Sequence, residues 1–437
     1  MTKWHFIVKS NISDDYKPDI YSEEPRIYVS LDAEDKFLAI KNNIYKVISG
    51  KASKLPSSLI LDLLNLAISV YTADLKIPRK FSKDRWTRTI LIHIPVVNLT
   101  TWEKDITSIV KMLEFLTGDR WAISFRKNEF KPKLTIKNKV EKASKVSLFS
   151  GGLDSLVGAI DLLEDGQRVA LVGHHGAGIT NKVQETVLQE LEKLYPDLIE
   201  SYLFYVQPPK SNSKGQGEPS MRSRSFLFFS LAVVVASLFA GKTPIYIAEN
   251  GLISLNVPLT NSRIGSLSTR TTHPYFVSLF SDFLSLLKIN SPIILPYRFQ
   301  TKGEMITNAK NQDALKKTVN LSMSCSHPEA GRYQGKQPNL HCGYCVPCII
   351  RRASLASAQL DRASEYAIDI LQDPPDYTTE TGRDLRAFEM AIKRGRFNNP
   401  HQALFDILAT GKITSDDIKD YVDVYSRGME EVQSFLL

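Results

Sequence analysis

A short glycine-rich loop carries the residue types that bind phosphate. Its two glycines allow a tight turn and bring backbone N–H groups close to phosphate oxygens. Ser155 falls in the first turn of a predicted helix, where unpaired amides and the helix dipole favour an anion. Asp154 would hold Mg²⁺ or order the loop, and the alternative is a structural turn with a Ser/Asp cap. This predicted phosphate-binding loop consists of Ser150, Gly151, Gly152, Leu153, Asp154 and Ser155.

The four cysteines of the chain follow the pattern C-x16-C-x2-C-x2-C. Thiolates separated by two residues are typical of closed tetrahedral zinc sites, and disulfides are not expected in a reducing compartment. Because four cysteines fill such a site, we expect His327 and His341 outside the ligand set and no cysteine left to carry sulfur. The predicted structural zinc ligands are Cys325, Cys342, Cys345 and Cys348.

The loop resembles the PP-loop of N-type ATP pyrophosphatases, which holds the β,γ-phosphates of ATP as the leaving group. Together with the cysteines, it resembles the QueC family over about residues 145–355. This resemblance implies ATP, Mg²⁺ and Zn²⁺ as cofactors. It also implies adenylation of an acid similar to 7-carboxy-7-deazaguanine, with release of pyrophosphate. In that family ammonia then displaces AMP, and a second ATP-dependent step dehydrates the amide to a nitrile.

The same resemblance points to site residues outside the loop. Lys302 lies in a Thr-Lys-x-Glu sequence that matches the family, and it is expected to reach phosphate or substrate. A helix cap or a surface charge is the alternative for each of these residues. We expect a catalytic role for Asp154, Ser155, Lys302 and Arg222. We expect substrate contacts from Arg224, Glu249, Asn250 and Arg270.

The chain also departs from the QueC family. Typical members are about half as long and lack its N-terminal region, and several of their loops differ here. In its length and its altered loops, the chain resembles the QueC-like proteins of bacterial anti-phage operons, above all the QatC group of the Qat system. That resemblance implies a protein acceptor, because the activated deazaguanine acid would be joined to the amino terminus of a small partner from the same operon.

The alternation of strands and helices from residue 145 predicts an α/β fold. A parallel, doubly wound sheet of the adenine nucleotide α-hydrolase type would place the loop at the carboxyl ends of its strands, where ligands bind. The apolar patterns predict strands at 146–149, 168–173, 202–206 and 244–248. They predict intervening helices that begin after the loop and at 182–195 and 226–240.

At 437 residues the chain is too long for one ordinary domain. We predict an accessory α+β domain for partner or substrate recognition over residues 1–140, with a strand at 89–96 and a helix at 106–116. The PP-loop domain with its cysteine site would span 141–355, and a helical region would span 356–437.

The composition, with 43% hydrophobic and 23% charged residues, is that of a soluble globular protein. The apolar segment 226–240 is shorter than the ~20 residues needed to cross a bilayer, so we expect a buried helix, no membrane contact and a cytoplasmic protein. Of the net charge of +8, eight basic and two acidic residues between Arg126 and Lys145 contribute +6. This strip could attract nucleic acid, and the alternative is a solvated connection between domains.

Three functions therefore stay open. The leading hypothesis is an ATP-dependent C–N ligase that forms AMP and pyrophosphate. The second is a 7-cyano-7-deazaguanine synthase that acts with ammonia in queuosine-type biosynthesis. The third is a non-catalytic, nucleotide-binding scaffold that binds nucleic acid through the basic strip. Modification of RNA is a further alternative.

Overall fold

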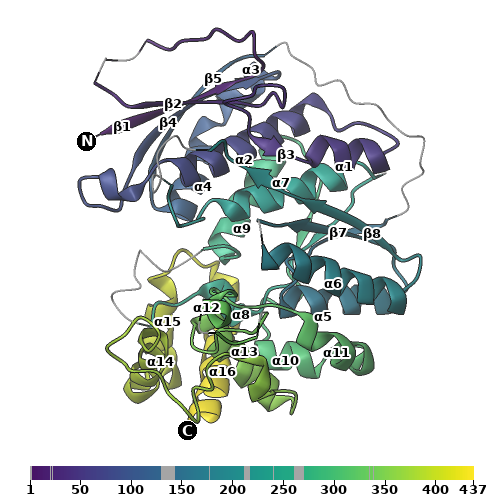
Figure 1. Cartoon of the computed structure of the whole chain (residues 1–437), viewed down its shortest axis with the longest axis vertical. Helices are drawn as coiled ribbons and strands as arrows, with labels where there is room; N and C mark the ends of the chain where they lie inside the picture. The colour runs from purple at the N-terminus through teal and green to yellow at the C-terminus, as the bar shows by residue number, and fades with distance from the viewer. Residues whose placement is uncertain are drawn as a thin grey trace.

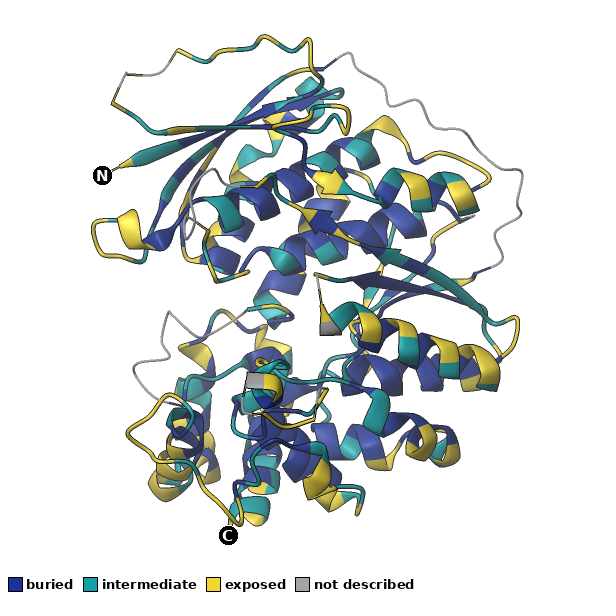
Figure 2. Cartoon of the chain, viewed as in Figure 1, coloured by how far each residue is buried: buried dark blue, intermediate teal, exposed yellow. Residues whose placement is uncertain are grey.

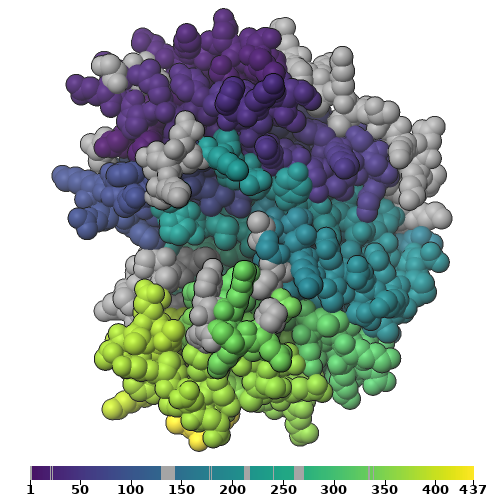
Figure 3. Space-filling model, viewed as in Figure 1, coloured from purple at the N-terminus to yellow at the C-terminus, as the bar shows by residue number. Residues whose placement is uncertain are grey.

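The computed structural model describes residues 2–19, 21, 23–128, 143–176, 178–210, 217–239, 241–259, 270–333, 335–337 and 339–437. Most of the basic strip lies outside these residues. In Figure 1 the N-terminal region forms the top of the molecule and the C-terminal helices form the bottom. The space-filling view in Figure 3 shows the same division in purple above and yellow-green below.

A five-stranded parallel sheet forms the centre of the chain, with the strand order β11-β10-β6-β7-β8. The chain order therefore reverses between β6 and β10. Such a switch point leaves a crevice at the carboxyl ends of the two strands. The strands are β6 (Lys145–Leu148), β7 (Val169–His174), β8 (Ile199–Phe204), β10 (Ile245–Tyr246) and β11 (Ile293–Ile294).

Alternating side chains of β7 show that both faces of this sheet are covered. Val169 and Leu171 belong to one hydrophobic cluster, while Ala170 and Val172 belong to another. Figure 2 shows these central elements as predominantly buried. The predicted α/β fold is confirmed. The helices of the first face are α5 (Leu153–Glu164), α6 (Ile179–Leu194), α10 (Lys302–Thr307) and α11 (Gln312–Thr318), and those of the second are α7 (Arg224–Ala236) and α9 (Pro274–Leu286).

The N-terminal region is built on a second sheet, with the order β2-β1-β4-β5. The predicted α+β class is wrong for this region, because all neighbouring strands are parallel. Parallel strands need crossover connections, and helices supply those from β2 to β4 and from β4 to β5. The strands are β1 (Lys3–Lys9), β2 (Arg26–Ser30), β4 (Thr89–Val96) and β5 (Arg120–Lys127), and the helices are α1 (Ile44–Lys51), α2 (Ser58–Lys76), the 3-10 helix η1 (Arg79–Phe81), α3 (Leu99–Lys104) and α4 (Ile106–Thr117).

The two sheets share one hydrophobic core. Helix α2 packs along α7, and the side chains of both helices belong to the same buried cluster. A short antiparallel pair, β3 (Lys41–Asn42) with β9 (Val206–Gln207), adds a second connection. Among the described residues, α2 is long and apolar enough to cross a membrane, but 72% of its apolar window is buried inside the protein. The predicted helix at 226–240 is α7, and nearly all its residues are buried.

The C-terminal helices pack around a separate cluster of buried side chains. The last helix, α16 (Ile418–Leu436), lies against α13 and α8 at the bottom of the molecule in Figure 1. The remaining helices are α8 (Gly251–Leu255), α12 (Ala330–Tyr333), α13 (Val346–Ser357), α14 (Arg383–Arg394) and α15 (Pro400–Leu408).

Candidate active site and metal centre

The glycine-rich loop leaves β6 at the switch point of the central sheet. Gly151 has φ +80°, a conformation that suits glycine, and a Cβ there would lie 3.0 Å from Cγ of Gln184. The Gln184 amide donates to the carbonyl oxygens of Phe149 and Ser150 at 3.2 and 3.1 Å. Helix α6 therefore holds the loop from one side.

Hydroxyl groups accept hydrogen bonds from the first amides of α5. The N–H of Gly152 donates to Ser150 Oγ at 3.2 Å, and the N–H of Leu153 donates to Ser324 Oγ at 3.0 Å. Ser150 Oγ also lies 3.1 Å from Ser155 Oγ. A serine side chain can change its rotamer, so an anion could take the place of these oxygens at the helix terminus.

Two carboxylates and a lysine meet beside the loop. Asp154 Oδ1 lies 2.7 Å from Lys302 Nζ, and its Oδ2 accepts from the Asn250 side chain at 2.6 Å. Burial alone would raise the pKa of Asp154, but the charge and hydrogen bond of Lys302 keep this pKa below its ordinary value. Burial and the adjacent Asp154 charge hold the pKa of Glu249 well above its ordinary value. Glu249 therefore favours its protonated form beside the Asp154 carboxylate, and a divalent cation could take the place of that proton.

These groups line a cavity of about 310 Å³ at the switch point. Half-buried Arg224 also faces the cavity, and its guanidinium donates to the carbonyl oxygen of His174 at 2.8 Å. Asn250 does not line the cavity, but its side chain donates a hydrogen bond to Asp154, which does. The predicted site residues that line the cavity are Ser150, Gly152, Leu153, Asp154, Ser155, Arg224, Glu249 and Lys302.

The structure does not bring Arg222 and Arg270 to this cavity. The Arg222 guanidinium lies over the Trp86 ring, 4.4 Å from its centroid, and burial lowers its pKa to about 10. The Arg270 guanidinium lies over Phe115 at the same distance and donates to its carbonyl oxygen. Both contacts are with the N-terminal region, so Arg222 points away from the side that Arg224 faces.

The segment before the first cysteine belongs to the site, although the sequence did not indicate it. Ser324 accepts from the first turn of α5, and the N–H of Met323 donates to the Gly151 carbonyl oxygen at 2.9 Å. Ser324, Cys325 and Ser326 also line the cavity. The one available signal was that Ser324 immediately precedes a predicted metal ligand.

The four cysteines meet as a group that could hold a metal ion, since their sulfur atoms all lie within 4.8 Å of one another. A tetrahedral zinc site with Zn–S bonds of about 2.3 Å separates its sulfurs by about 3.8 Å, and Cys342 Sγ lies 3.7 Å from Cys348 Sγ. Backbone N–H groups of Ser326, His327 and Cys342 donate to the sulfurs, as suits thiolates.

Neither nearby histidine is part of the group of four sulfur atoms, although the His327 side chain makes a hydrogen bond with Cys345. His327 stacks on Tyr344 with ring centroids 5.7 Å apart, while His341 is buried against Tyr366. Gly343 makes the tight turn between two of the cysteines at φ +90°, where a Cβ would lie 2.0 Å from the Ile368 carbonyl oxygen. The four cysteines that the sequence predicted as zinc ligands are therefore arranged so that they could hold a metal ion.

A close approach fixes where the second carboxylate lies. A Cβ on Gly158 of α5 would lie only 2.3 Å from Cβ of Ala248, the residue before Glu249. The absence of a side chain at position 158 therefore lets α5 lie directly on the segment that follows β10. This contact sets the separation between Asp154, at the start of α5, and Glu249.

Comparison with known proteins supports one relationship. No family model matches the chain. The chain is 26% identical to a 7-cyano-7-deazaguanine synthase of Saccharolobus solfataricus over 270 aligned positions, which cover 56% of this chain. The chain is a distant homologue of that synthase. The similarity spans 50% of the relative's length and supports a QueC-like family. The narrower assignment to the QatC group stays a prediction.

Proposed function

We propose that the chain is an ATP-dependent ligase that adenylates a deazaguanine carboxylate and releases pyrophosphate. The observation that carries this proposal is the shared cavity of the glycine-rich loop and the Asp154–Glu249–Lys302 cluster. The loop supplies amides for a phosphate chain, and the cluster supplies charge beside it. The name of the homologous synthase supports a deazaguanine substrate.

Each group in the cavity has a task in this reaction. The amides of Gly152 and Leu153 would bind the departing diphosphate, and Lys302 with Arg224 would offset the negative charge that develops there. Asp154 and Glu249 are the residues that would hold Mg²⁺, which neutralises phosphate charge when it is bound. Ser150 and Ser155 would donate hydrogen bonds to phosphate oxygens, once Ser150 no longer accepts from the Gly152 N–H and Ser155 no longer donates to the Gly152 carbonyl oxygen.

The chemistry then proceeds in two displacements. A carboxylate oxygen of the acid attacks the α-phosphorus of ATP, the bond to the β-phosphate oxygen breaks, and pyrophosphate leaves. An amine attacks the resulting acyl carbon and loses a proton, while AMP leaves with the electron pair of the broken C–O bond. The product is an amide, so the overall reaction forms a C–N bond.

We propose that the amine is the amino terminus of a small partner protein that acts with this chain in anti-phage defence. The resemblance to the QatC group supports this acceptor. The N-terminal region gives further support, because it lies outside the crevice of the central sheet and offers a surface for a partner. The four free thiols suit a reducing cytoplasm, where we place the reaction.

The four cysteines would hold Zn²⁺ in a structural role. The bound metal would fix the segment that carries Ser324, and Ser324 in turn accepts a hydrogen bond from the first turn of α5. Zinc would thus shape the nucleotide cavity without contacting the reacting atoms.

Isotope transfer tests the adenylation step. The protein is incubated with ATP, Mg²⁺ and 7-carboxy-7-deazaguanine that carries ¹⁸O in its carboxylate, and the nucleotides are analysed by mass spectrometry. We expect equal amounts of AMP and pyrophosphate, with one ¹⁸O atom in AMP once the acyl group has been transferred to an amine. A reaction without the acid is the control. ADP as the sole nucleotide product would exclude the proposal.

The main alternative is that the chain itself makes 7-cyano-7-deazaguanine for a queuosine-type pathway. The name of the homologous synthase favours it. Ammonia as the sole amine distinguishes the two functions, because efficient nitrile formation would support the alternative. A scaffold, by contrast, would bind ATP without forming either AMP or pyrophosphate.

A further inference from the structure

A groove of about 420 Å³ follows strand β2 in the N-terminal region. This strand is the outermost strand at one edge of its sheet, since the order is β2-β1-β4-β5. The groove lies in a different part of the chain from the nucleotide cavity, and the two share no lining residue. The lining includes Trp4, Arg26, Ile27, Tyr28, Phe37 and Phe81.

The backbone of β2 offers hydrogen-bonding groups toward the groove. The N–H and C=O of one strand residue point to the same side, and alternate residues point to opposite sides. Ser30 bonds outward, with its N–H donating to the Leu38 carbonyl oxygen at 2.8 Å. Arg26 and Tyr28 share that direction, and within the described residues their outward backbone groups have no hydrogen-bond partner. Such an edge is a template for an added strand.

Aromatic side chains at the groove are open to solvent. Phe37 is 85% exposed and Phe81 is 51% exposed, although both are large and apolar. Phe81 lies beside Trp4 with ring centroids 6.5 Å apart. Exposed apolar groups that gather in a concave surface mark interaction sites, and these rings can receive an apolar side chain of a partner.

The charge of the groove selects the partner. Its charged lining residues are Arg26, Lys76 and Lys210, and no carboxylate is among the described lining residues. Lys76 Nζ donates to the Pro209 carbonyl oxygen at 3.0 Å and so is held at the groove wall. A cationic groove attracts a negatively charged segment and disfavours a positively charged one.

We propose that an extended acidic segment of a partner protein pairs with the free edge of β2. Its backbone would add a strand to the sheet, an apolar side chain would lie against Phe37 and Phe81, and its carboxylates would face the three cations. This proposal goes beyond the proposed function, because strand pairing at β2 needs neither ATP nor the metal centre.

Fluorescence anisotropy with a labelled peptide tests the proposal without any nucleotide. The probe is an eight-residue peptide in which glutamate alternates with leucine, and the full chain is the titrant. One control peptide replaces each glutamate with lysine. A second keeps the sequence but carries N-methyl groups on alternate amides, which removes strand-pairing donors. We expect saturable binding of the first peptide, and at least about tenfold weaker binding of both controls.

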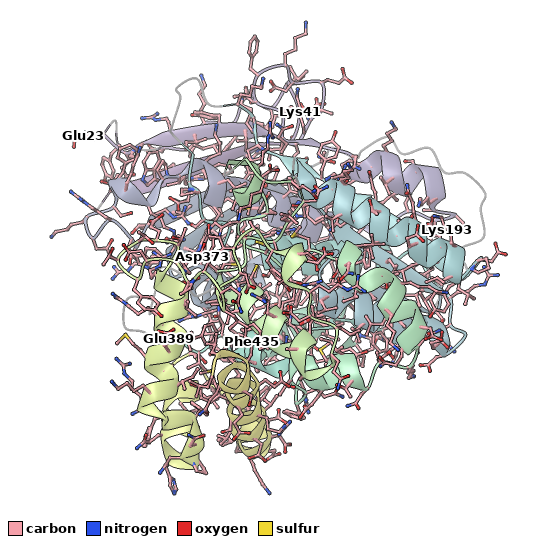
Figure 4. All side chains as sticks on the ribbon, turned by 60° about the horizontal axis from the view of Figure 1, so that its bottom comes forward. Glu23, Lys41, Lys193, Asp373, Glu389 and Phe435 are labelled. Carbon is pink, nitrogen blue, oxygen red and sulfur yellow. The ribbon has the colours of Figure 1, made fainter. Side chains whose placement is uncertain are left out.

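Matched substitutions locate the binding. We expect Phe37→Ala and Arg26→Glu each to weaken binding about tenfold or more, with unfolding temperatures close to wild type. Phe405→Ala removes a phenylalanine that is 68% exposed in the C-terminal helices and should leave binding unchanged. Lys193→Glu is the charge control, and Figure 4 shows Lys193 across the molecule from Glu23, three residues before β2.

Four outcomes would overturn the proposal. The first is a lack of peptide binding, and the second is equal binding of the lysine peptide. The third is binding that Phe37→Ala and Arg26→Glu leave unchanged. The fourth is a competing occupant of the groove. A dimer that is seen in sedimentation and is lost in Phe37→Ala would assign the edge to a second copy of the chain. Displacement of the peptide by a single-stranded oligonucleotide would assign the groove to nucleic acid. None of these outcomes bears on AMP formation, which is measured separately.

Discussion

Asp154 is the residue on which the charge of the cavity at the switch point depends. Its carboxylate pairs with Lys302 at 2.7 Å and accepts from Asn250. It also raises the pKa of Glu249, whose burial acts in the same direction. A buried lysine that lost this partner would keep its desolvation cost without the compensating charge. The residue therefore fixes both the charge of the cavity and the proton of its neighbour.

We predict that Asp154→Asn lowers the acid-dependent release of pyrophosphate by about 10²–10³-fold. Asparagine keeps the shape and can still accept from Asn250, but it removes the negative charge that pairs with Lys302 and would hold Mg²⁺. Coupled pyrophosphate detection gives the rate, and circular dichroism gives the unfolding temperature. Asp165→Asn, at an exposed position near the end of α5, is the control. A rate near that of wild type in Asp154→Asn would remove Asp154 from the mechanism.

Sequence predicted the site where its residues are local and missed it where they are distant. The loop needs only six consecutive residues, and the cysteine pattern spans one segment, so both were recognised. Ser324 makes a hydrogen bond with Leu153, 171 positions earlier in the sequence, and Gln184 makes one with Ser150, 34 positions earlier. No local sequence pattern reveals such contacts. Arg222 and Arg224 show the opposite difficulty, because two residues of one type so close together give no sign of which faces the cavity.

At the scale of elements, the C-terminal helix α16 fixes the start of α10. Glu431 of α16 accepts from the Thr301 hydroxyl and from the N–H of Gly303. Arg427, one turn earlier, lies 2.6 Å from Glu304, which closes the capping box of α10 with Thr301. Lys302 is the first residue of α10. A helix remote in sequence thus positions the lysine of the nucleotide cavity.

We predict that Glu431 makes the stability of the protein depend on pH. Burial raises the pKa of Glu431, and nearby Glu304 adds to this rise, although hydrogen bonds from Thr301, Gly303 and Ser354 oppose it. Since the folded pKa exceeds the ordinary value of 4.5, the bound proton stabilises the fold at low pH. This contribution is lost as the pH rises through the folded pKa.

Unfolding temperatures measured from pH 4.5 upward check this expectation. The wild type should lose stability over a pH range in which Glu431→Gln does not. Glu430→Gln, a neighbouring exposed glutamate, should behave like the wild type. Parallel curves for wild type and Glu431→Gln would contradict the assignment.

We predict that Cys345→Ser removes the metal and lowers the unfolding temperature by more than about 10 °C, since structural zinc contributes on the order of 10 kcal/mol to folding. It should also raise the KM for ATP, because Ser324 would no longer be held against the first turn of α5. Atomic absorption gives the metal content per chain. Stoichiometric zinc in Cys345→Ser would refute a four-cysteine site.

At the scale of the molecule, residues on both sides of the domain boundary predicted near residue 140 belong to one continuous hydrophobic core. Helix α2 of the N-terminal region and helix α7 of the central region bury their apolar side chains in one cluster. The apolar segment 226–240 predicted α7 as a buried helix, but α2 was not predicted, and the sequence carried no information about which helix packs on which. The C-terminal helices, in contrast, share a separate cluster with residues of α8 and α13 that precede residue 356.

We predict that a chain shortened to residues 143–437 does not fold, because loss of α2 would expose the apolar side of α7 to water. Size-exclusion chromatography should show aggregates. The control is the full chain cut once between residues 128 and 143 by an introduced protease site, whose two fragments should elute together. A monomeric, cooperatively unfolding 143–437 fragment would show that the central region is independent.

The contact of Gly158 with Ala248 has a consequence for how this protein can change. The carboxyl groups of Asp154 and Glu249 lie on different segments, and their spacing depends on where α5 packs on the chain before Glu249. One added carbon atom at position 158 would wedge these segments apart while every group that meets substrate kept its identity. A substitution at Gly158 could therefore change the reaction rate by shifting the packing of α5, although Gly158 does not belong to the cavity lined by the loop.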